Sequence, residues 1–444
     1  MGLKYIEQVK SVILLLLILL SLTLTFTIWT FSPSYNTNDT PIVDIAIAEK
    51  KKMEDVVKPY RLLYSHEDKL TGSTSPLILE KVFSSMKTWE LQTVEPLKNK
   101  ISFQQINEYI RTPNRLTFFY PAEVPIKTFS KILSFDDRNL PDASFNRLVI
   151  DWNKTPDEEV HLYLINTIKQ KVYTTHVDKV DKETFSANIY KQSISLSPYN
   201  EIEREGQLSL YASNNPENIM GFTYYLEDIS VAPEKFRNAL FSNPSLVQSN
   251  PKGTSGKEYS DDSALMIVNY MPLELRYVHP ASESNNAGNP AELVQQTVNF
   301  VNEHNGWTNE YRLHRINPAT LQVSYQLYLY GMPVFSKDTS TEIMQQWGEN
   351  RVYRYNRPYY TLNESTPIKT RDVPLSSGQA TYDLISTISD INMSSVDEIL
   401  VGYNLSKDDE QPLLNLEPSW YYLINGSWKQ VSPELLGGGN YGLE

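Results

Sequence analysis

The chain has 444 residues, of which 40% are hydrophobic, and it carries a formal net charge of −13 at pH 7. This length is sufficient for about two or three domains, each with a core of its own. A negative chain without a long basic stretch is unsuited to nucleic-acid binding, because neutralising phosphates requires clustered lysine and arginine. The sequence contains no cysteine, which excludes disulfides, thiolate metal sites and a lipid-modified cysteine anchor.

Residues 12–31 form a long apolar stretch that predicts a single transmembrane helix. At about 1.5 Å per residue, a helix of about 20 residues spans the roughly 30 Å hydrocarbon core of a bilayer. Trp29 falls near the outer end, where indole rings favour the membrane interface. The alternative is a cleaved signal peptide, whose apolar region is shorter, about 7 to 15 residues, and ends in a small-x-small site. Here Thr30-Phe31-Ser32-Pro33 follows the run, which favours a retained helix.

The charges that flank this helix predict its orientation. Lys4 and Lys10 precede it, whereas Asp39, Asp44 and Glu49 follow it before the first lysine on that side. Because cytoplasmic flanks carry the excess of basic residues, we expect residues 1–11 in the cytoplasm, with Lys10 at the inner interface. The rest of the chain would then be extracytoplasmic, and the helix would hold it to the lipid bilayer.

Small hydroxyl residues form two stripes on the outer half of the predicted membrane helix. At about 100° per residue, Ser21 and Thr25 share one face, and Thr23, Thr27 and Thr30 share nearly the opposite one. Small residues let transmembrane helices approach closely, so the stripes predict packing against partner helices. The alternative is that these hydroxyls are only tolerated, because each can bond back to its own helix.

Residues 32–59 are polar and predict a linker, partly helical near its end. Within it, the run 50–52 of three lysines is either solvated or in loose contact with anionic lipid or wall polymer. Residues 60–262 then predict a first α+β domain. Its expected helices are 75–89 and 102–111, and its expected strands are 115–120, 145–152, 160–165 and 172–176.

Two smaller modules, 263–362 and 363–444, each place a helix before a sheet. In the first, Asn289 caps a helix that Gly306 ends, and an antiparallel strand over 321–329, half-buried by its alternating pattern, turns at Gly331. In the second, a helix from Ser377 precedes a strand over 399–403. The dipeptide Asn425-Gly426 then predicts a hairpin with a type I′ turn. The fold class is therefore α+β, with one membrane helix and three extracytoplasmic domains.

Motifs that carry chemistry are missing from the sequence. No histidines have zinc spacing, and no nucleophile elbow, phosphate loop or dinucleotide fingerprint occurs. The runs starting at Asp137 and Asp151 resemble calcium loops but lack the glycine and the glutamate that such loops need. Tyrosines between Tyr353 and Tyr360 would stack a sugar or a base if exposed, although an amphipathic edge strand shows the same alternation. We expect no catalytic residue, no metal site and no cofactor.

The sequence resembles the YycH family of regulatory proteins from low-GC Gram-positive bacteria. The resemblance is carried by segments from end to end: 9–14, Trp29-x-Phe31-Ser32-Pro33, 145–151, 306–313, Trp420-Tyr421 and Gly426-x-Trp428. It implies an extracytoplasmic α+β protein on one N-terminal helix that acts, with its relative YycI, on the membrane histidine kinase WalK, also called YycG. That system governs cell-wall metabolism. The family implies no catalytic residues, and its later two modules share a topology.

The sequence thus favours an interaction protein, a membrane-anchored accessory regulator of a histidine kinase with a YycI-like sister protein as partner. A protein that binds wall fragments or polymer through a tyrosine-rich cleft, without a kinase partner, is the alternative. An enzyme is the third and weakest interpretation.

Overall fold

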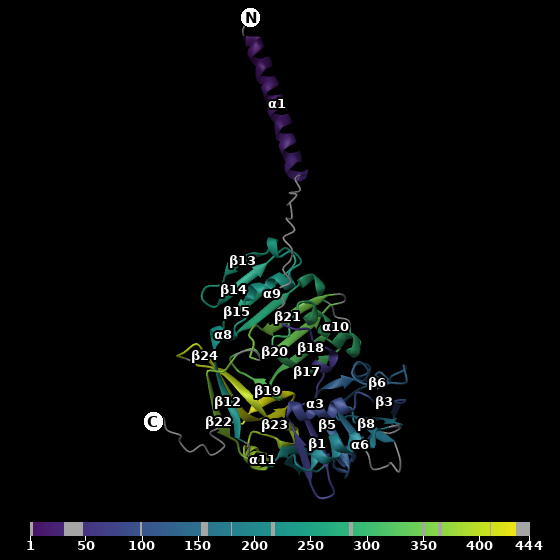
Figure 1. Ribbon diagram of the computed structural model, residues 1–444. Helices are drawn as coiled ribbons and strands as arrows, with labels where there is room; N and C mark the ends of the chain where they lie inside the picture. Colours follow the sequence, from purple (N-terminus) through teal and green to yellow (C-terminus); the bar gives the residue numbers. More distant parts are fainter. Residues whose placement is uncertain are drawn as a thin grey trace. The chain divides into compact units, whose positions relative to one another are not determined.

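The computed structural model describes residues 3–30, 48–97, 100–151, 159–178, 180–214, 218–283, 287–348, 351–362, 366–408 and 410–431 (Figure 1). The linker up to residue 47, most of the second calcium-loop candidate and the tail from residue 432 lie outside these ranges. The chain divides into two units, Met1–Ile45 and Ala46–Glu444, which we describe separately.

The first unit contains one helix, α1 (Leu3–Thr30), of 28 residues. Between positions 13 and 24 its large aliphatic side chains are 49% to 62% exposed. Among the described residues, no helix has both the length and the hydropathy that crossing a membrane requires. The predicted membrane span at 12–31 is therefore present as a helix as far as Thr30, and its place in a membrane stays a prediction.

The second unit begins with an antiparallel nine-stranded sheet in the order β11-β10-β2-β1-β5-β7-β8-β9-β4. Its strands are β1 (Arg61–Ser65), β2 (Leu70–Ser73), β4 (Glu95–Pro96), β5 (Arg115–Pro125), β7 (Ser144–Asp151), β8 (Val160–Asn166), β9 (Lys171–Val177), β10 (Ser197–Ile202) and β11 (Leu210–Ser213). The short strands β3 (Glu90–Leu91) and β6 (Ser134–Phe135) pair separately. The four strands predicted between 115 and 176 are all confirmed.

Helices cover both faces of this sheet. Phe118 and Phe119 are neighbours on β5 and so point to opposite faces. Phe118 contacts Phe83 of α3 (Pro76–Ser85), whereas Phe119 lies in the same cluster as Ile106 of α4 (Phe103–Arg111). Both predicted helices are therefore present, each with its apolar side on the sheet, although the first ends at Ser85 and not at residue 89 as predicted. The shorter helices between residues 53 and 240 are α2 (Met53–Val56), α5 (Ile126–Phe129), α6 (Lys182–Phe185), η1 (Ser186–Tyr190), α7 (Lys191–Ser193), α8 (Leu226–Ile229) and α9 (Pro233–Leu240).

The rest of the unit is built on a fourteen-stranded sheet, whose main path is β13-β14-β15-β16-β21-β20-β18-β19-β23-β24-β12-β22. β17 pairs with β18, and β25 pairs with β24. The strands are β12 (Asn218–Tyr225), β13 (Gln248–Pro251), β14 (Gly256–Ser260), β15 (Leu265–Asn269), β16 (Glu274–Val278), β17 (Glu310–Asn317), β18 (Gln322–Leu329), β19 (Met332–Phe335), β20 (Glu342–Trp347), β21 (Val352–Pro358), β22 (Lys369–Pro374), β23 (Val396–Lys407), β24 (Leu413–Ile424) and β25 (Ser427–Gln430).

Two capped helices belong to this region. In α10 (Pro290–Glu303), the Asn289 side chain accepts bonds from two main-chain amides, and Val294, Val298 and Val301 are buried. In α11 (Gly378–Ser386), the Ser377 hydroxyl accepts from an amide of the first turn. Both predicted helices are confirmed. Three 3-10 turns complete the elements: η2 (Pro244–Leu246), η3 (Pro280–Ser282) and η4 (Met393–Ser395).

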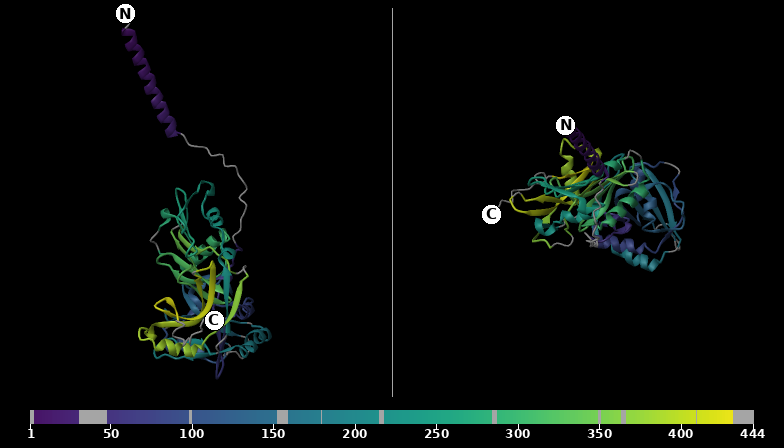
Figure 2. Two further views of the ribbon diagram at one scale, coloured as in Figure 1. Left: turned by 90° about the vertical axis from the view of Figure 1, so that its left-hand side faces the viewer. Right: turned by 90° about the horizontal axis from the view of Figure 1, so that it is seen from above.

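The predicted hairpin near the end of the chain is also confirmed. β24 and β25 flank Asn425 and Gly426, which have φ angles of 51° and 73°. Positive φ at both central positions is what a type I′ turn requires. Before this turn, β24 runs beside β23 over most of its length, as the long yellow strands show (Figure 2).

The expectation of a half-buried strand over 321–329 is wrong, because every residue of β18 after Gln322 is buried. The face of β18 that carries Gln326 and Tyr328 is buried by other residues of the same unit. Gln326 donates to the Val334 carbonyl, and Tyr328 shares a cluster with Phe119 of the nine-stranded sheet. The alternation in the sequence therefore marks two different buried environments and not a core face and a solvent face.

The two sheets share a core, and pairing runs across the predicted modules. β12, from the segment 60–262, lies between β22 and β24 of the segment 363–444. The end of the predicted linker also joins this body. Val56 and Val57 are 1% and 2% exposed, and Asn302 of α10 bonds to both main-chain groups of Lys51. The exact domain boundaries stay a prediction.

Candidate functional site

The hydroxyl stripes of α1 lie on its exposed surface. Ser21, Thr23 and Thr25 are all exposed. Thr23 Oγ1 donates to the Leu19 and Leu20 carbonyls, each at 2.9 Å, and Thr25 Oγ1 donates to the Ser21 carbonyl at 2.8 Å. These threonine hydroxyls are thus already bonded within the helix. A partner helix would therefore benefit from the small size of these residues, which permits close approach, and not from free hydrogen-bond donors.

The structure describes the side chain of only one of three other predicted positions of α1. Lys10 is exposed. The side chains of Thr27 and Trp29 lie outside the described residues. Their roles in helix packing and at the interface stay predictions.

The tyrosine run from Tyr353 to Tyr360 is not a ligand surface, and its strand is not an edge. β21 lies between β16 and β20, and Tyr355 and Tyr360 are fully buried. Helix α10 supplies the cover, since Phe300 lies edge-on to the Tyr355 ring at 5.1 Å. The run belongs to the core because the sheet continues on both of its sides.

A buried polar cluster holds this part of the core together. Arg357 donates from Nη1 to the Gly306 carbonyl at 2.5 Å and to Tyr355 Oη at 2.9 Å, and its guanidinium lies 4.5 Å from the Phe236 ring centre. His304 lies 3.1 Å from the same Tyr355 hydroxyl. Burial, together with the Arg357 charge, lowers the pKa of His304 from 6.5 to about 3. The imidazole is therefore neutral, and the cluster is structural.

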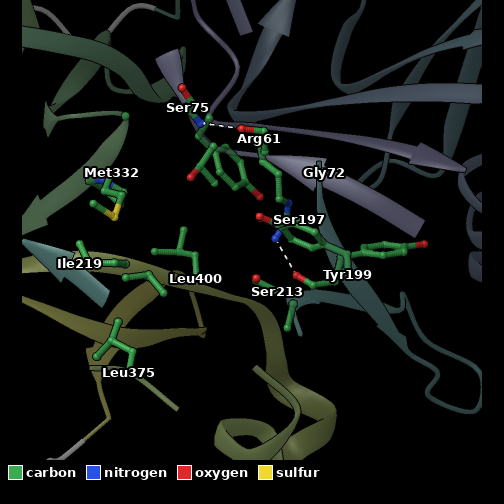
Figure 3. Close-up of a pocket in the computed structure, with 18 of the residues that line it drawn as sticks. Arg61, Gly72, Ser75, Ser197, Tyr199, Ser213, Ile219, Met332, Leu375 and Leu400 are labelled. Carbon is green, nitrogen blue, oxygen red and sulfur yellow. Dashed lines mark hydrogen bonds between the residues drawn. The ribbon is translucent and has the colours of Figure 1, made fainter. Parts of the chain in front are cut away.

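A cleft with a volume of about 590 Å³ lies where the two sheets meet (Figure 3). Figure 3 shows aliphatic side chains, such as Ile219, Met332 and Leu400, on one side of it. Arg61 and Tyr199 lie on the other side. The lining also includes four tyrosines and five serines: Tyr60, Tyr199, Tyr211, Tyr330, Ser73, Ser75, Ser197, Ser213 and Ser376.

At the inner end of the cleft, a charged contact joins the sheets. Arg61 of β1 donates to both carboxylate oxygens of Glu398 on β23, at 3.0 and 3.1 Å, and the two side chains are 3% and 8% exposed. Tyr60 Oη donates to the same carboxylate at 2.5 Å, and Arg147 Nη2 lies 3.6 Å away. We call these four residues the Arg61–Glu398 cluster.

Charge and burial in this cluster fix the ionic states. Burial and the neighbouring Glu398 carboxylate raise the pKa of Tyr60, so its hydroxyl stays protonated and can donate. Both guanidinium groups lie over the Phe119 ring, at 4.4 Å for Arg61 and 4.3 Å for Arg147. A buried charge pair of this kind specifies how the two sheets fit more than it adds net stability.

The chemistry offered by the cleft is recognition. Its described lining includes hydroxyls, aromatic rings, aliphatic groups and one arginine, without a histidine or a carboxylate. Across the described residues, no group of three or more histidine, aspartate or glutamate side chains is placed to hold a metal. Such a lining is suited to binding and orienting a ligand.

Sequence reasoning did not find this cleft. Arg61 and Glu398 are 337 positions apart, and neither stands in a motif. The one available signal was that each charge interrupts an apolar strand, at 61–65 and 396–403. Charges in buried strands are generally paired, but the sequence does not say with which partner.

Comparisons with known proteins cover the chain from end to end. A model described as the N-terminal domain of YycH protein matches residues 7–195, and one described as its C-terminal domain matches residues 207–436. The two-component system WalR/WalK regulatory protein YycH of Bacillus subtilis (strain 168) is 21% identical over 458 aligned residues, 99% of each chain.

Solved structures agree on the fold. The crystal structure of YycH from Bacillus subtilis superposes with a TM-score of 0.71 at 17% identity, over 87% of this chain and 99% of that chain. The C-terminal domain of YpeB from Bacillus megaterium reaches a TM-score of only 0.26 at 10% identity, over 46% of this chain and 99% of that chain, which supports no inference. With both domain models matched in order along the sequence, the chain belongs to the YycH family of regulatory proteins.

Proposed function

We propose that this protein is a membrane-anchored accessory regulator of a WalK-type (YycG-type) histidine kinase, acting together with a YycI-like sister protein. The observation that carries the proposal is the alignment with the WalR/WalK regulatory protein YycH, which covers 99% of both chains. An alignment over 99% of both chains supports a shared role better than a shared fold alone would.

The anchoring part of the proposal rests on α1. Its aliphatic side chains are exposed on all sides between positions 13 and 24, as expected for a helix that meets lipid or other helices. The flanking charges support a cytoplasmic N-terminus and an extracytoplasmic body. An extracytoplasmic reporter fused after Glu444 should be active, and an inactive reporter would reverse the assigned orientation.

Contact with the kinase and sister spans is proposed to run through the two hydroxyl stripes. Lipid is as apolar as leucine, so helices recognise each other in a membrane by close packing. Ser21→Leu with Thr25→Leu fills one stripe while keeping the segment insertable. We expect this pair, or Thr23→Leu with Thr27→Leu, to weaken association by about 1 kcal/mol or more.

A membrane two-hybrid assay with the kinase and YycI-like spans measures this association at equal membrane levels. Leu20→Ile with Leu24→Ile, which keeps apolar volume on the same helix, is the matched control and should retain the wild-type signal. If both stripe variants also keep that signal, the stripes do not recognise partner spans. Recognition would then have to lie in the exterior domains.

A second candidate is a protein that binds wall fragments or polymer and needs no kinase. The observation that favours it is the cleft with its four tyrosines, since aromatic rings and hydroxyls suit sugars. A chain truncated shortly after residue 31 separates the two functions. If the protein is a kinase regulator, the truncated chain retains part of the regulatory activity. If it is a wall-ligand binding protein, the truncated chain retains none.

A further inference from the structure

The inner end of the cleft between the two sheets holds an excess of buried positive charge. The Arg61–Glu398 cluster contains two guanidinium groups and one carboxylate, while burial raises the pKa of Tyr60 and keeps that hydroxyl neutral. Among the described residues, no second carboxylate forms an ion pair with Arg61 or Arg147. One positive charge is therefore left without a counter-charge, and a buried charge of this kind favours an anion beside it.

Arg61 also has a hydrogen-bond donor that no described group accepts. Its side chain is only 3% exposed, and it donates from Nη1 to the Tyr211 carbonyl and from Nη2 to Glu398. Its Nε is buried and has no hydrogen-bond partner among the described residues, and the same holds for Ser213 Oγ in the same lining. Because buried donors are nearly always bonded, two open ones in one lining point to a ligand that carries an acceptor.

The wall of the cleft away from Arg61 is aliphatic. Figure 3 shows Ile219, Met332, Leu375 and Leu400 on that side. Strands β11 and β23 already pack against each other beside the cleft. A peptide backbone would need partners for its amide groups along this wall, whereas a hydrocarbon chain needs none. The wall therefore suits a hydrocarbon chain better than a peptide.

The size and the mouth of the cleft suit a small amphiphilic molecule. Its volume of about 590 Å³ lies within the range of about 300 to 1,000 Å³ that is typical of small-molecule sites. At the rim, Leu77 is 81% exposed and Tyr330 is 58% exposed. Tyr60 and Tyr211 are 6% and 2% exposed, so these two rings offer little surface for stacking on a sugar.

We infer that this cleft binds a single-chain fatty carboxylate, whose head group accepts from Arg61 Nε and whose hydrocarbon chain lies along the aliphatic wall toward the rim. Charge-assisted hydrogen bonds between a guanidinium and a carboxylate are among the strong ones in proteins. Burial of the chain against aliphatic side chains supplies further affinity. The inference does not depend on the kinase, the sister protein or the membrane helix.

The test uses the full chain in nanodiscs of zwitterionic phosphatidylcholine and palmitate that is isotope-labelled at its carboxyl carbon. Carbon NMR separates palmitate bound by the protein from palmitate in the bilayer, whose signal is defined with empty nanodiscs. We expect one bound palmitate per chain. Methyl palmitate, labelled at the same carbon, keeps the hydrocarbon chain and lacks the charge. Its ratio of protein-bound to bilayer signal should be lower by about tenfold or more.

The pH at which the bound carboxyl group titrates tests where the head group lies. A guanidinium beside a carboxyl group favours its ionised form. The bound carboxyl should therefore stay ionised at a pH at which the carboxyl in the bilayer is already protonated, and the carbon chemical shift reports both in one sample. A bound carboxyl that titrates together with the bilayer pool would overturn the inference, because the head group would then lie away from Arg61.

Two matched variants test whether palmitate lies in this cleft. Leu77→Asp removes an apolar contact and adds a negative charge at the rim, so it should weaken palmitate binding severalfold. Leu246→Asp makes the same change at an exposed leucine of η2 outside the cleft and should leave binding unchanged. Both leucines are exposed, so neither replacement opens a cavity in the core. Equal effects of the two variants would overturn the inference, because the bound palmitate would then lie elsewhere.

Three further outcomes would also overturn it. The first is the absence of any palmitate signal beyond that of empty nanodiscs. The second is an equal ratio of bound to bilayer signal for palmitate and methyl palmitate, which would show that the charge is not recognised. The third is binding of an N-acetylglucosamine tetramer that Leu77→Asp weakens, without bound palmitate, which would make the cleft a glycan site.

Discussion

Acidification should destabilise the protein, in part through the buried imidazole of His304. His304 is 7% exposed, and its pKa is lowered to about 3 from the ordinary value of 6.5. Between these two values the unfolded chain binds a proton that the folded chain does not. Above pH 6.5 the imidazole is neutral in both states and does not change the free energy of unfolding. As the pH falls from 6.5 toward 3, protonation of the unfolded chain lowers the free energy of unfolding. At pH 5 the difference is about 1.5 pH units, or about 2 kcal/mol.

The assay compares melting temperatures of the full chain in detergent at pH 7.5 and pH 5. For a body of this size, about 2 kcal/mol corresponds to a shift of about 2 °C. His304→Gln lacks the titrating group, so its loss between the two pH values should be smaller than that of the wild type by this amount. Tyr355→Phe removes the hydrogen-bond partner and keeps the imidazole, so it should preserve the wild-type pH difference.

The comparison of pH differences cancels the contributions of carboxylates elsewhere and of His314, whose pKa burial also lowers, because these groups are common to all three proteins. Equal pH differences for the wild type and His304→Gln would refute the reasoning, since the imidazole would then not be a neutral group held in the core.

Three other changes should alter stability by amounts that follow from local geometry. Glu398→Leu leaves Arg61 and Arg147 buried without their carboxylate and should cost about 3 to 5 kcal/mol by calorimetry, with partial recovery on adding Arg61→Met. Gly426→Val should cost about 1 kcal/mol or more, because φ is 73° there, and unchanged unfolding would contradict the type I′ turn. Asn289→Ala should cost about 1 kcal/mol by removing the α10 cap, whereas Asn289→Ser should largely preserve it.

The sequence predicted those parts of the fold that short segments determine. A turn at Asn425-Gly426 and caps at Asn289 and Ser377 depend on residues within a few positions, so the pattern and the structure agree. The burial of β18 depends on what covers its second face. Tyr328 is buried in a cluster that includes Phe119 of β5, and the alternation around Tyr328 carries no information about that cluster.

The candidate sites divide in the same way. The stripes of α1 could be placed by helical periodicity, and Ser21 and Thr25 do lie exposed on that helix. The cleft requires β1 and β23 to meet, and the Arg61–Glu398 contact closes a loop of 337 positions. Periodicity also placed the tyrosines around Tyr355 on an edge strand, whereas their strand is central. An edge strand and a central strand can show the same alternation of polar and apolar residues.

The position of β12 has a consequence for how the chain acquires its structure. Residues 218–225 are made when about half of the chain has been synthesised, yet both strands that flank them, 369–374 and 413–424, are made much later. Until then β12 presents two open edges, and such edges promote aggregation and attract proteases. Pairing over this sequence distance is also slow. A nonsense mutation before residue 413 would therefore not simply remove a module, because it would leave the middle of the protein without a finished sheet.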